Sequence, residues 1–192
     1  MKYTKTATQI FTMLVLCCGL WSCGQNKRDA QTSGNAQTSD VYQYNGWKDF
    51  SQENYSIKYP SDWKLNTSGM MESKFFIFSQ DQSPSDNFAK NVVLLTEQTP
   101  LSLDDYIKAQ NKAIEKFFPY YKKIEGERIQ DGSGAYYKLI GTFKQGDVQI
   151  KNEQHIWLSN GTAYILTFTS AQNDFDRYKD IGKQILASFR IK

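Results

Sequence analysis

Few residues in this sequence have the types and spacings that support chemistry. His155 is the only histidine among 192 residues, so a multi-histidine metal site is excluded and a Ser-His-Asp triad would depend on His155 alone. The three cysteines, Cys17, Cys18 and Cys23, all lie near the N-terminus, which leaves the body of the chain without a thiol nucleophile or a thiolate ligand. The sequence also has no phosphate-binding loop, dinucleotide fingerprint or zinc-binding helix motif. We therefore expect no enzyme activity, no cofactor and no metal site.

One loop carries oxygen-bearing side chains at alternate positions, in a pattern faintly similar to a calcium-binding loop. It covers residues 81–87, Asp-Gln-Ser-Pro-Ser-Asp-Asn. A calcium loop needs Gly at its sixth position and Glu at its twelfth, where this chain has Asp86 and Val92. We expect a solvated loop, with calcium binding as the alternative that a calorimetric titration would decide.

An aromatic group around His155 is the candidate ligand or partner face. Asn160-Gly161 lies between two alternating runs and predicts a two-residue hairpin turn, because both turn residues must adopt positive φ. This turn places Trp157 opposite Tyr164 and His155 opposite Leu166. A second turn at Gln145-Gly146 predicts that Lys138 lies opposite Glu153. The candidate face then comprises Tyr136, His155, Trp157 and Tyr164. The alternative is that these side chains are part of the core and pack against a helix.

A basic stripe follows one side of a predicted helix over residues 103–118. At 100° per residue, Lys108, Lys112 and Lys116 lie opposite an apolar sector that includes Ile107 and Phe117. Near an anionic membrane each lysine would contribute about 1 kcal/mol of attraction. The stripe is therefore a candidate membrane-facing surface. The alternative is that it is the solvent-exposed face of an ordinary amphipathic helix.

The N-terminus has the organisation of an export signal. Lys2 and Lys5 precede an apolar stretch over residues 10–21. Twelve residues rise about 18 Å as a helix, well short of the roughly 30 Å hydrocarbon core of a membrane. The length fits the apolar region of a removable signal peptide. We expect residues 1–22 to be that peptide.

The residues at the cleavage point resemble the bacterial lipobox. The sequence is Leu20-Trp21-Ser22-Cys23, with an aliphatic residue at −3 and a small one at −1. The resemblance implies a diacylglycerol on Cys23, with N-acylation of the new terminus, and two or more chains anchor a protein stably to a membrane. Gly24 follows Cys23, which by the same analogy permits passage to the outer membrane if the cell has one, facing the periplasm or the surface. Plain secretion after Ser22 is the alternative.

The segment that follows is polar, and the charge left after cleavage is small. Residues 23–46 would form the lipidated N-terminus and a flexible tether, because their composition cannot bury enough apolar area to offset ordering. Removal of residues 1–22 takes Lys2 and Lys5 from the 23 Lys and Arg residues and leaves 21 against 20 Asp and Glu residues. A net charge of about +1 argues against a nucleic-acid partner.

Residues 47–192 are predicted to form one α+β domain. Apolar residues occur on both faces of the hairpin around Asn160-Gly161, so we expect both faces to be covered. The fold class is then an α/β/α sandwich, a central antiparallel sheet with a helix on each face. Gly182 lies inside the apolar stripe of the last helix, where a missing side chain allows close approach. The expected strands are residues 55–59, 74–79, 90–97, 121–130, 135–144, 147–159 and 162–169, and the expected helices are residues 103–118 and 173–189.

Two sequence segments resemble the PsbP-like domain family. One is the opening Tyr-Ser-Ile-Lys-Tyr-Pro-Ser-Asp-Trp at residues 55–63, and the other is Phe168-Thr169 leading into a helix that ends Ile-Leu-Ala-Ser-Phe at residues 185–189. The resemblance covers residues 47–192 and implies an α/β/α sandwich. It also implies a non-enzymatic role as an extrinsic or assembly factor, and many bacterial members are exported lipoproteins.

These observations favour a lipid-anchored cell-envelope protein without catalytic activity. We expect it to contact the membrane through Cys23 and to bind an envelope protein as an accessory or assembly module. The first alternative is a carrier of a small ligand or lipid that uses the aromatic face. The second is a hydrolase with an unrecognised site.

Overall fold

The computed structural model describes residue 44 and residues 46–80, 88–132 and 134–192. The predicted signal peptide, Cys23, most of the tether and the candidate calcium loop lie outside these residues. Within them, no helix combines the length and the apolar character that crossing a membrane requires. The first described strand begins at Trp47.

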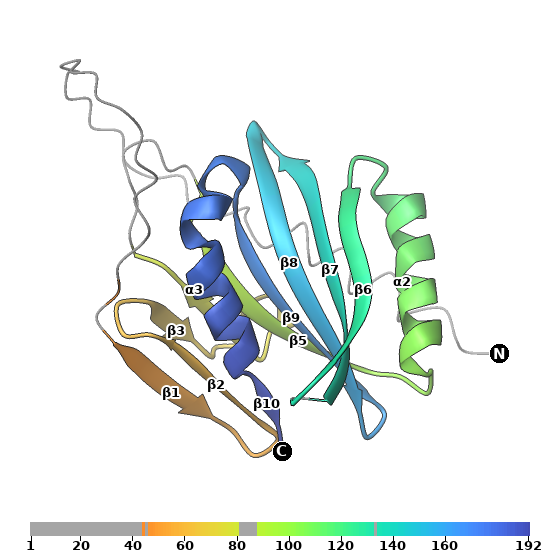
Figure 1. Cartoon of the computed structure of the whole chain (residues 1–192), viewed down its shortest axis with the longest axis horizontal. Helices are drawn as coiled ribbons and strands as arrows, with labels where there is room; N and C mark the ends of the chain where they lie inside the picture. Colours follow the sequence, from red (N-terminus) through yellow and green to blue (C-terminus); the bar gives the residue numbers. More distant parts are fainter. Residues whose placement is uncertain (1–43, 45, 81–87, 133) are drawn as a thin grey trace.

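A seven-stranded antiparallel sheet forms the centre of the fold (Figure 1). Its order is β3-β4-β5-β9-β8-β7-β6, so strands that follow one another along the chain mostly pair with each other. The four longest strands, β6 to β9, follow the helix α2 (Leu103–Phe117) along the chain and form a continuous meander. The bounds are β3 Lys64–Asn66, β4 Phe75–Phe78, β5 Asn91–Gln98, β6 Lys122–Asp131, β7 Gly134–Gln145, β8 Val148–Ser159 and β9 Thr162–Ala171.

Two helices cover opposite faces of this sheet, as the sequence predicted. Helix α2, Leu103–Phe117, packs Tyr106 and Ile107 into a cluster with Ile156 and Ile165 of the sheet. Ser102 caps it, since its Oγ accepts a hydrogen bond from the backbone N–H of Asp105. Helix α3, Phe175–Ser188, covers the other face. The expected α+β sandwich is therefore confirmed.

A second, smaller sheet completes the cover on the α3 side. It contains β1 Trp47–Ser51, β2 Tyr55–Pro60 and β10 Arg190–Ile191 in the order β1-β2-β10. Tyr55 and Ile57 of β2 belong to the same buried cluster as Ile185 and Phe189. The sequence predicted β2 but not its partners, because β1 is short and the two residues of β10 pair with a strand about 130 positions earlier in the chain.

The β8–β9 register agrees with the turn predicted at Asn160-Gly161, and the β7–β8 register does not agree with its prediction. Asn160 and Gly161 both have positive φ, and Trp157 lies opposite Tyr164. In the other hairpin, however, Gln145 pairs with Val148, so the turn residues are Gly146 and Asp147. Gly146 has a φ of +56° and takes the conformation that favours glycine. The predicted Lys138–Glu153 pair is therefore wrong by two positions: Lys138 lies opposite His155 and Glu153 lies opposite Ile140. A shift of two keeps every side chain on its predicted face.

Gly182 brings helix α3 into direct contact with the sheet, as its position in the apolar stripe predicted. A Cβ atom at this position would lie 2.6 Å from the ring of Phe168, which is fully buried. A side chain here therefore requires the helix and the sheet to separate.

We expect Gly182→Ala to lower the free energy of unfolding by about 1–3 kcal/mol, because overpacking a rigid core outweighs the roughly 1 kcal/mol gain in helix propensity. Urea denaturation measures this change. The matched control is Lys183→Ala at the next, exposed position, where we expect less than about 0.5 kcal/mol. An unfolding midpoint equal to or above that of the native chain would contradict the predicted contact.

Candidate functional site

The four residues of the predicted aromatic face lie together, and they lie in the core. Tyr136, His155, Trp157 and Tyr164 are each between 4 and 8 % exposed. The ring centroids of Tyr136 and Trp157 are 5.1 Å apart, and those of Tyr136 and His155 are 4.6 Å apart. Phe189, directly after α3, lies 5.1 Å from Trp157 and 6.2 Å from Tyr164. These rings occupy the space between sheet and helix, which is what packing of a core requires.

His155 has a buried carboxylate as its partner. Its Nε2 atom lies 3.0 Å from Oε1 of Glu153, and Glu153 is only 3 % exposed. The two residues occupy alternate positions of β8, so their side chains point to the same face of the sheet. The sequence predicted Lys138 as the partner of Glu153, and the contact with His155 was missed. The sequence signal for this contact was the spacing of Glu153 and His155, which are two positions apart on one strand and therefore share a face.

A carboxylate and an imidazole are two parts of a nucleophilic triad, and the third part is an activated hydroxyl or thiol. The rings beside His155 belong to Tyr136 and Trp157. The indole is no nucleophile. The phenol of Tyr136 is a poor one, because burial raises its pKa and the neighbouring Asp131 raises it further. The geometry around His155 therefore fits a core hydrogen bond better than covalent catalysis.

A half-exposed charge cluster lies next to this pair, on the same face of the sheet. Lys138 Nζ contacts Oε1 of Glu125 and lies 3.3 Å from Oε1 of Glu127, both on β6. The hydrogen bond from Lys138 lowers the pKa of Glu125. Partial burial acts to lower the pKa of Lys138, but its hydrogen bonds with Glu125 and Glu127 leave that pKa raised. The cluster thus joins the edge strand to its neighbour.

We expect Lys138→Met to lower stability at pH 7 by at most about 1 kcal/mol, because the partner carboxylates are exposed enough for solvent to screen them. The pKa of Glu125 is lowered in the folded state, so its contribution is present above the unfolded value of about 4.3 and is lost as the pH falls through the lower folded value. The difference between variant and native chain should therefore shrink between about pH 5 and pH 3. Urea denaturation at several pH values measures it, with Lys108→Met as the exposed control. A difference that grows towards low pH would contradict the assignment.

The predicted basic stripe lies on the outer side of α2. Lys108, Lys112 and Lys116 are on the side away from the buried Ile107 and Ile114. Within the described part of the chain none of the three forms an ion pair with a carboxylate. All three are exposed and available to an anionic surface.

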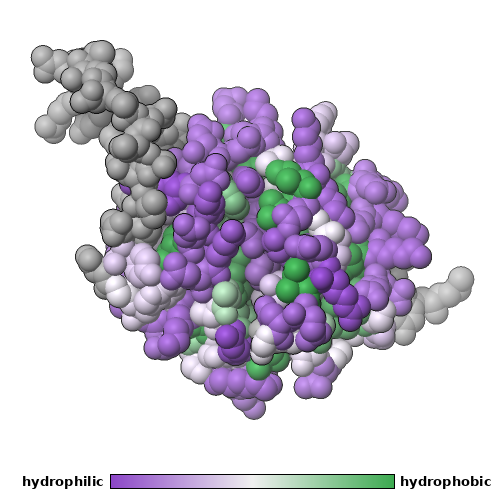
Figure 2. Space-filling view, in the orientation of Figure 1, coloured by the Kyte–Doolittle hydropathy of each residue, from purple (hydrophilic) through white to green (hydrophobic). Residues whose placement is uncertain are grey.

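Three large apolar side chains are exposed where α2 ends and β6 begins. We name Phe117, Tyr120 and Ile124 the α2–β6 corner; they are 46, 82 and 58 % exposed. Pro119 ends the helix, as its missing N–H requires. Helical periodicity predicted Phe117 in the buried sector, which is wrong: Phe117 is exposed, whereas its neighbour Phe118 packs against the cluster of Ile114 and Leu139. Figure 2 shows apolar areas among the mostly hydrophilic side chains of the face that carries α3.

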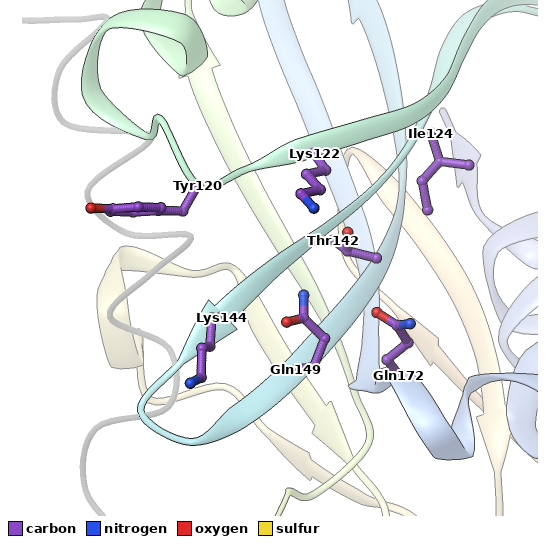
Figure 3. A pocket seen from close by; sticks show the side chains of 7 residues that line it. All are labelled: Tyr120, Lys122, Ile124, Thr142, Lys144, Gln149 and Gln172. Carbon is purple, nitrogen blue, oxygen red and sulfur yellow. The ribbon is translucent and has the colours of Figure 1, made fainter.

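A cavity of about 530 Å³ lies beside this corner (Figure 3). It occupies the part of the α3-side face close to the β7–β8 turn. Figure 3 shows the side chains of Lys122, Thr142 and Gln149 near its centre, with Tyr120 and Lys144 at one side and Ile124 and Gln172 at the other. The lining residues are Tyr120, Lys122, Ile124, Thr142, Lys144, Gln149 and Gln172. None of them belongs to the predicted aromatic face.

Comparison with known proteins identifies the fold. No protein-family model and no curated protein sequence matches the chain. Among solved structures it is similar to the cyanobacterial PsbP protein CyanoP from Synechocystis, with a TM-score of 0.56 and 12 % identity over 84 % of this chain and 98 % of that one. The fold is PsbP-like. The resemblance predicted from the sequence is therefore confirmed for the architecture.

Two further structures share this PsbP-like architecture. One is PA94 from Pseudomonas aeruginosa, a protein of unknown function described as a putative regulator, with a TM-score of 0.53 and 15 % identity over 74 % of this chain and 94 % of that one. The other is LpqN of Mycobacterium tuberculosis, described as involved in cell envelope biogenesis, with a TM-score of 0.52 and 13 % identity over 77 % of this chain and 92 % of that one. At these identities the likeness extends to the fold alone.

Proposed function

We propose that the chain is an exported lipoprotein, anchored through lipid on Cys23, whose PsbP-like domain is a non-catalytic accessory module that binds a protein partner in the cell envelope. The export signal and the lipobox-like sequence support the location. The fold supports the accessory role, since LpqN, which shares it, is described as involved in cell envelope biogenesis.

The α2–β6 corner is the observation that carries the partner-binding role. Single exposed apolar residues are ordinary on protein surfaces. Here three large ones fall within the eight residues from Phe117 to Ile124, and Tyr120 is exposed over most of its surface. Aromatic residues are enriched in protein interfaces, where a large rigid side chain is buried at low entropic cost.

The absence of catalysis is part of the proposal and rests on the surroundings of His155. The imidazole and the Glu153 carboxylate are buried among aromatic rings. Substrate access to the imidazole would require the rings of Tyr136 and Trp157, which pack against it, to move. The carrier alternative meets the same obstacle, because the aromatic face is already occupied by side chains of the core.

Site-specific photo-crosslinking in cells tests the partner surface. A photoreactive amino acid is placed at Phe117, at Tyr120, or at the exposed control position Lys64 on the far strand β3. We expect the same discrete adduct from both corner positions and none from Lys64, with the adduct reduced when Tyr120→Ala is combined with the probe at Phe117. Equal adducts from Lys64, or none from the corner, would contradict the proposed surface.

Metabolic labelling with a fatty acid tests the anchor separately. We expect label on the native chain and none on Cys23→Ser, which should be released from the membrane fraction. An unlabelled native chain would overturn the lipid assignment and leave the partner surface to be judged by crosslinking.

A further inference from the structure

The lining of the cavity beside the α2–β6 corner combines positive charge with neutral hydrogen-bonding groups. Two lysines, Lys122 on β6 and Lys144 on β7, contribute ammonium groups, and none of the described residues that line the cavity carries a carboxylate. Within the described part of the chain, neither lysine forms an ion pair with an acidic side chain. Lys138, further along β7, is in contrast matched by Glu125 and Glu127. The cavity therefore holds two positive charges that the described residues leave uncompensated.

Three neutral hydrogen-bonding side chains line the same cavity as the two lysines. Thr142 contributes a hydroxyl from the floor, where it is buried, and Gln149 and Gln172 contribute carboxamides from β8 and from the turn after β9. Gln149 Nε2 donates to the backbone carbonyl of Phe143 at 3.2 Å. This bond orients the amide and still leaves its second N–H and its Oε1 for a ligand.

Apolar side chains flank the polar floor. Tyr120 and Ile124 stand at the sides of the cavity and expose most of their surface. A flat ring and an aliphatic side chain are suited to contact the C–H faces of a sugar ring. The amides and the hydroxyl are suited to its hydroxyl groups, since each donates and accepts. A volume of about 530 Å³ falls within the roughly 300–1,000 Å³ of small-molecule sites.

We propose that this cavity binds an anionic sugar, with Lys122 and Lys144 holding its carboxylate or phosphate and Thr142, Gln149 and Gln172 bonding its hydroxyls. Charge-assisted hydrogen bonds of this kind are stronger than neutral ones. The site requires neither a lipid on Cys23 nor a protein partner. The cavity shares Tyr120 and Ile124 with the α2–β6 corner, whereas its lysines and carboxamides do not belong to the corner. Variants of Lys122 and Lys144 therefore test the cavity, and Phe117→Ala tests the partner surface.

Calorimetric titration of the purified full chain tests the site with four defined probes. These are trigalacturonate for a carboxylate sugar, glucose 6-phosphate for a phosphate sugar, maltotriose for a neutral sugar, and inorganic phosphate alone. The test variant is Lys122→Gln/Lys144→Gln. The matched control is Lys108→Gln/Lys112→Gln on α2, which removes the same charge from positions outside the cavity. Circular dichroism verifies that each variant is folded.

We expect at least one of the two anionic sugars to bind, and the sugar that binds identifies the anionic group. The double variant at the cavity should weaken that binding about tenfold or more, and the control variant by less than about twofold. Four results would overturn the proposal: no binding of either anionic sugar at 10 mM, equal binding of maltotriose, equal binding of inorganic phosphate alone, or equal weakening by both double variants.

Discussion

Replacing Trp157 with alanine is expected to lower the free energy of unfolding by about 3–5 kcal/mol, the range for truncating a buried aromatic side chain. The indole is 4 % exposed and contacts the rings of Tyr136, His155 and Phe189. Its removal leaves a cavity between the sheet and the end of α3 that these neighbours fill only in part. Urea denaturation at pH 7 measures the loss, with the slope of the transition as a check on two-state unfolding.

The matched control is Tyr120→Ala, which removes an aromatic side chain that is 82 % exposed. We expect this change to alter stability by less than about 0.5 kcal/mol. The pair of variants also decides between a core and a carrier. A native chain that binds a fatty acid, together with a Trp157→Ala variant that loses this binding and keeps its stability, would contradict the core assignment.

Separating His155 from Glu153 is expected to have the second-largest effect. Glu153→Ala should cost about 2–3 kcal/mol, because it removes a buried side chain and leaves the buried imidazole without its 3.0 Å partner. His155→Ala should cost a similar amount for the reciprocal reason. The two changes are not independent, since each removes the same hydrogen bond.

A double-mutant cycle isolates the interaction. We expect the double variant to be less destabilised than the sum of the single variants, with a coupling of about 1–2 kcal/mol between two buried groups in contact. Glu127→Ala is the control, because this carboxylate is half-exposed and its ion pair with Lys138 is worth at most about 1 kcal/mol. Additive costs for His155 and Glu153 would show that the contact between these two side chains contributes nothing to stability.

The parts of the fold that depend on interactions between residues close in sequence could be predicted. Ser102 caps α2 through a hydrogen bond to a residue three positions later. Asn160-Gly161 set the β8–β9 register, since their backbone preference leaves few ways to connect two strands. The apolar residues on both faces of that hairpin predicted two covering layers, and the structure has α2 on one face and α3 on the other.

Where two local choices were similar, tertiary contacts decided. The turn after β7 could use Gln145-Gly146 or Gly146-Asp147, and the structure has the second. The small sheet was beyond local prediction, because β10 is two residues long and is a strand only through its pairing with β2. The exposure of Phe117 was also unpredictable, because helical periodicity gives a direction around the axis and does not tell which residues at the end of the helix contact the sheet.

The sequence by itself determined which strand side chains share a face, where the β8–β9 hairpin turns, and that few groups suited to catalysis are present. Only the tertiary structure decided that His155 contacts Glu153 inside the core, and that Tyr120, Lys122, Lys144 and Gln172 surround one cavity. The reason is physical. Spacing along a strand or helix fixes the relative direction of neighbouring side chains, whereas burial and contact between distant segments depend on how whole layers pack.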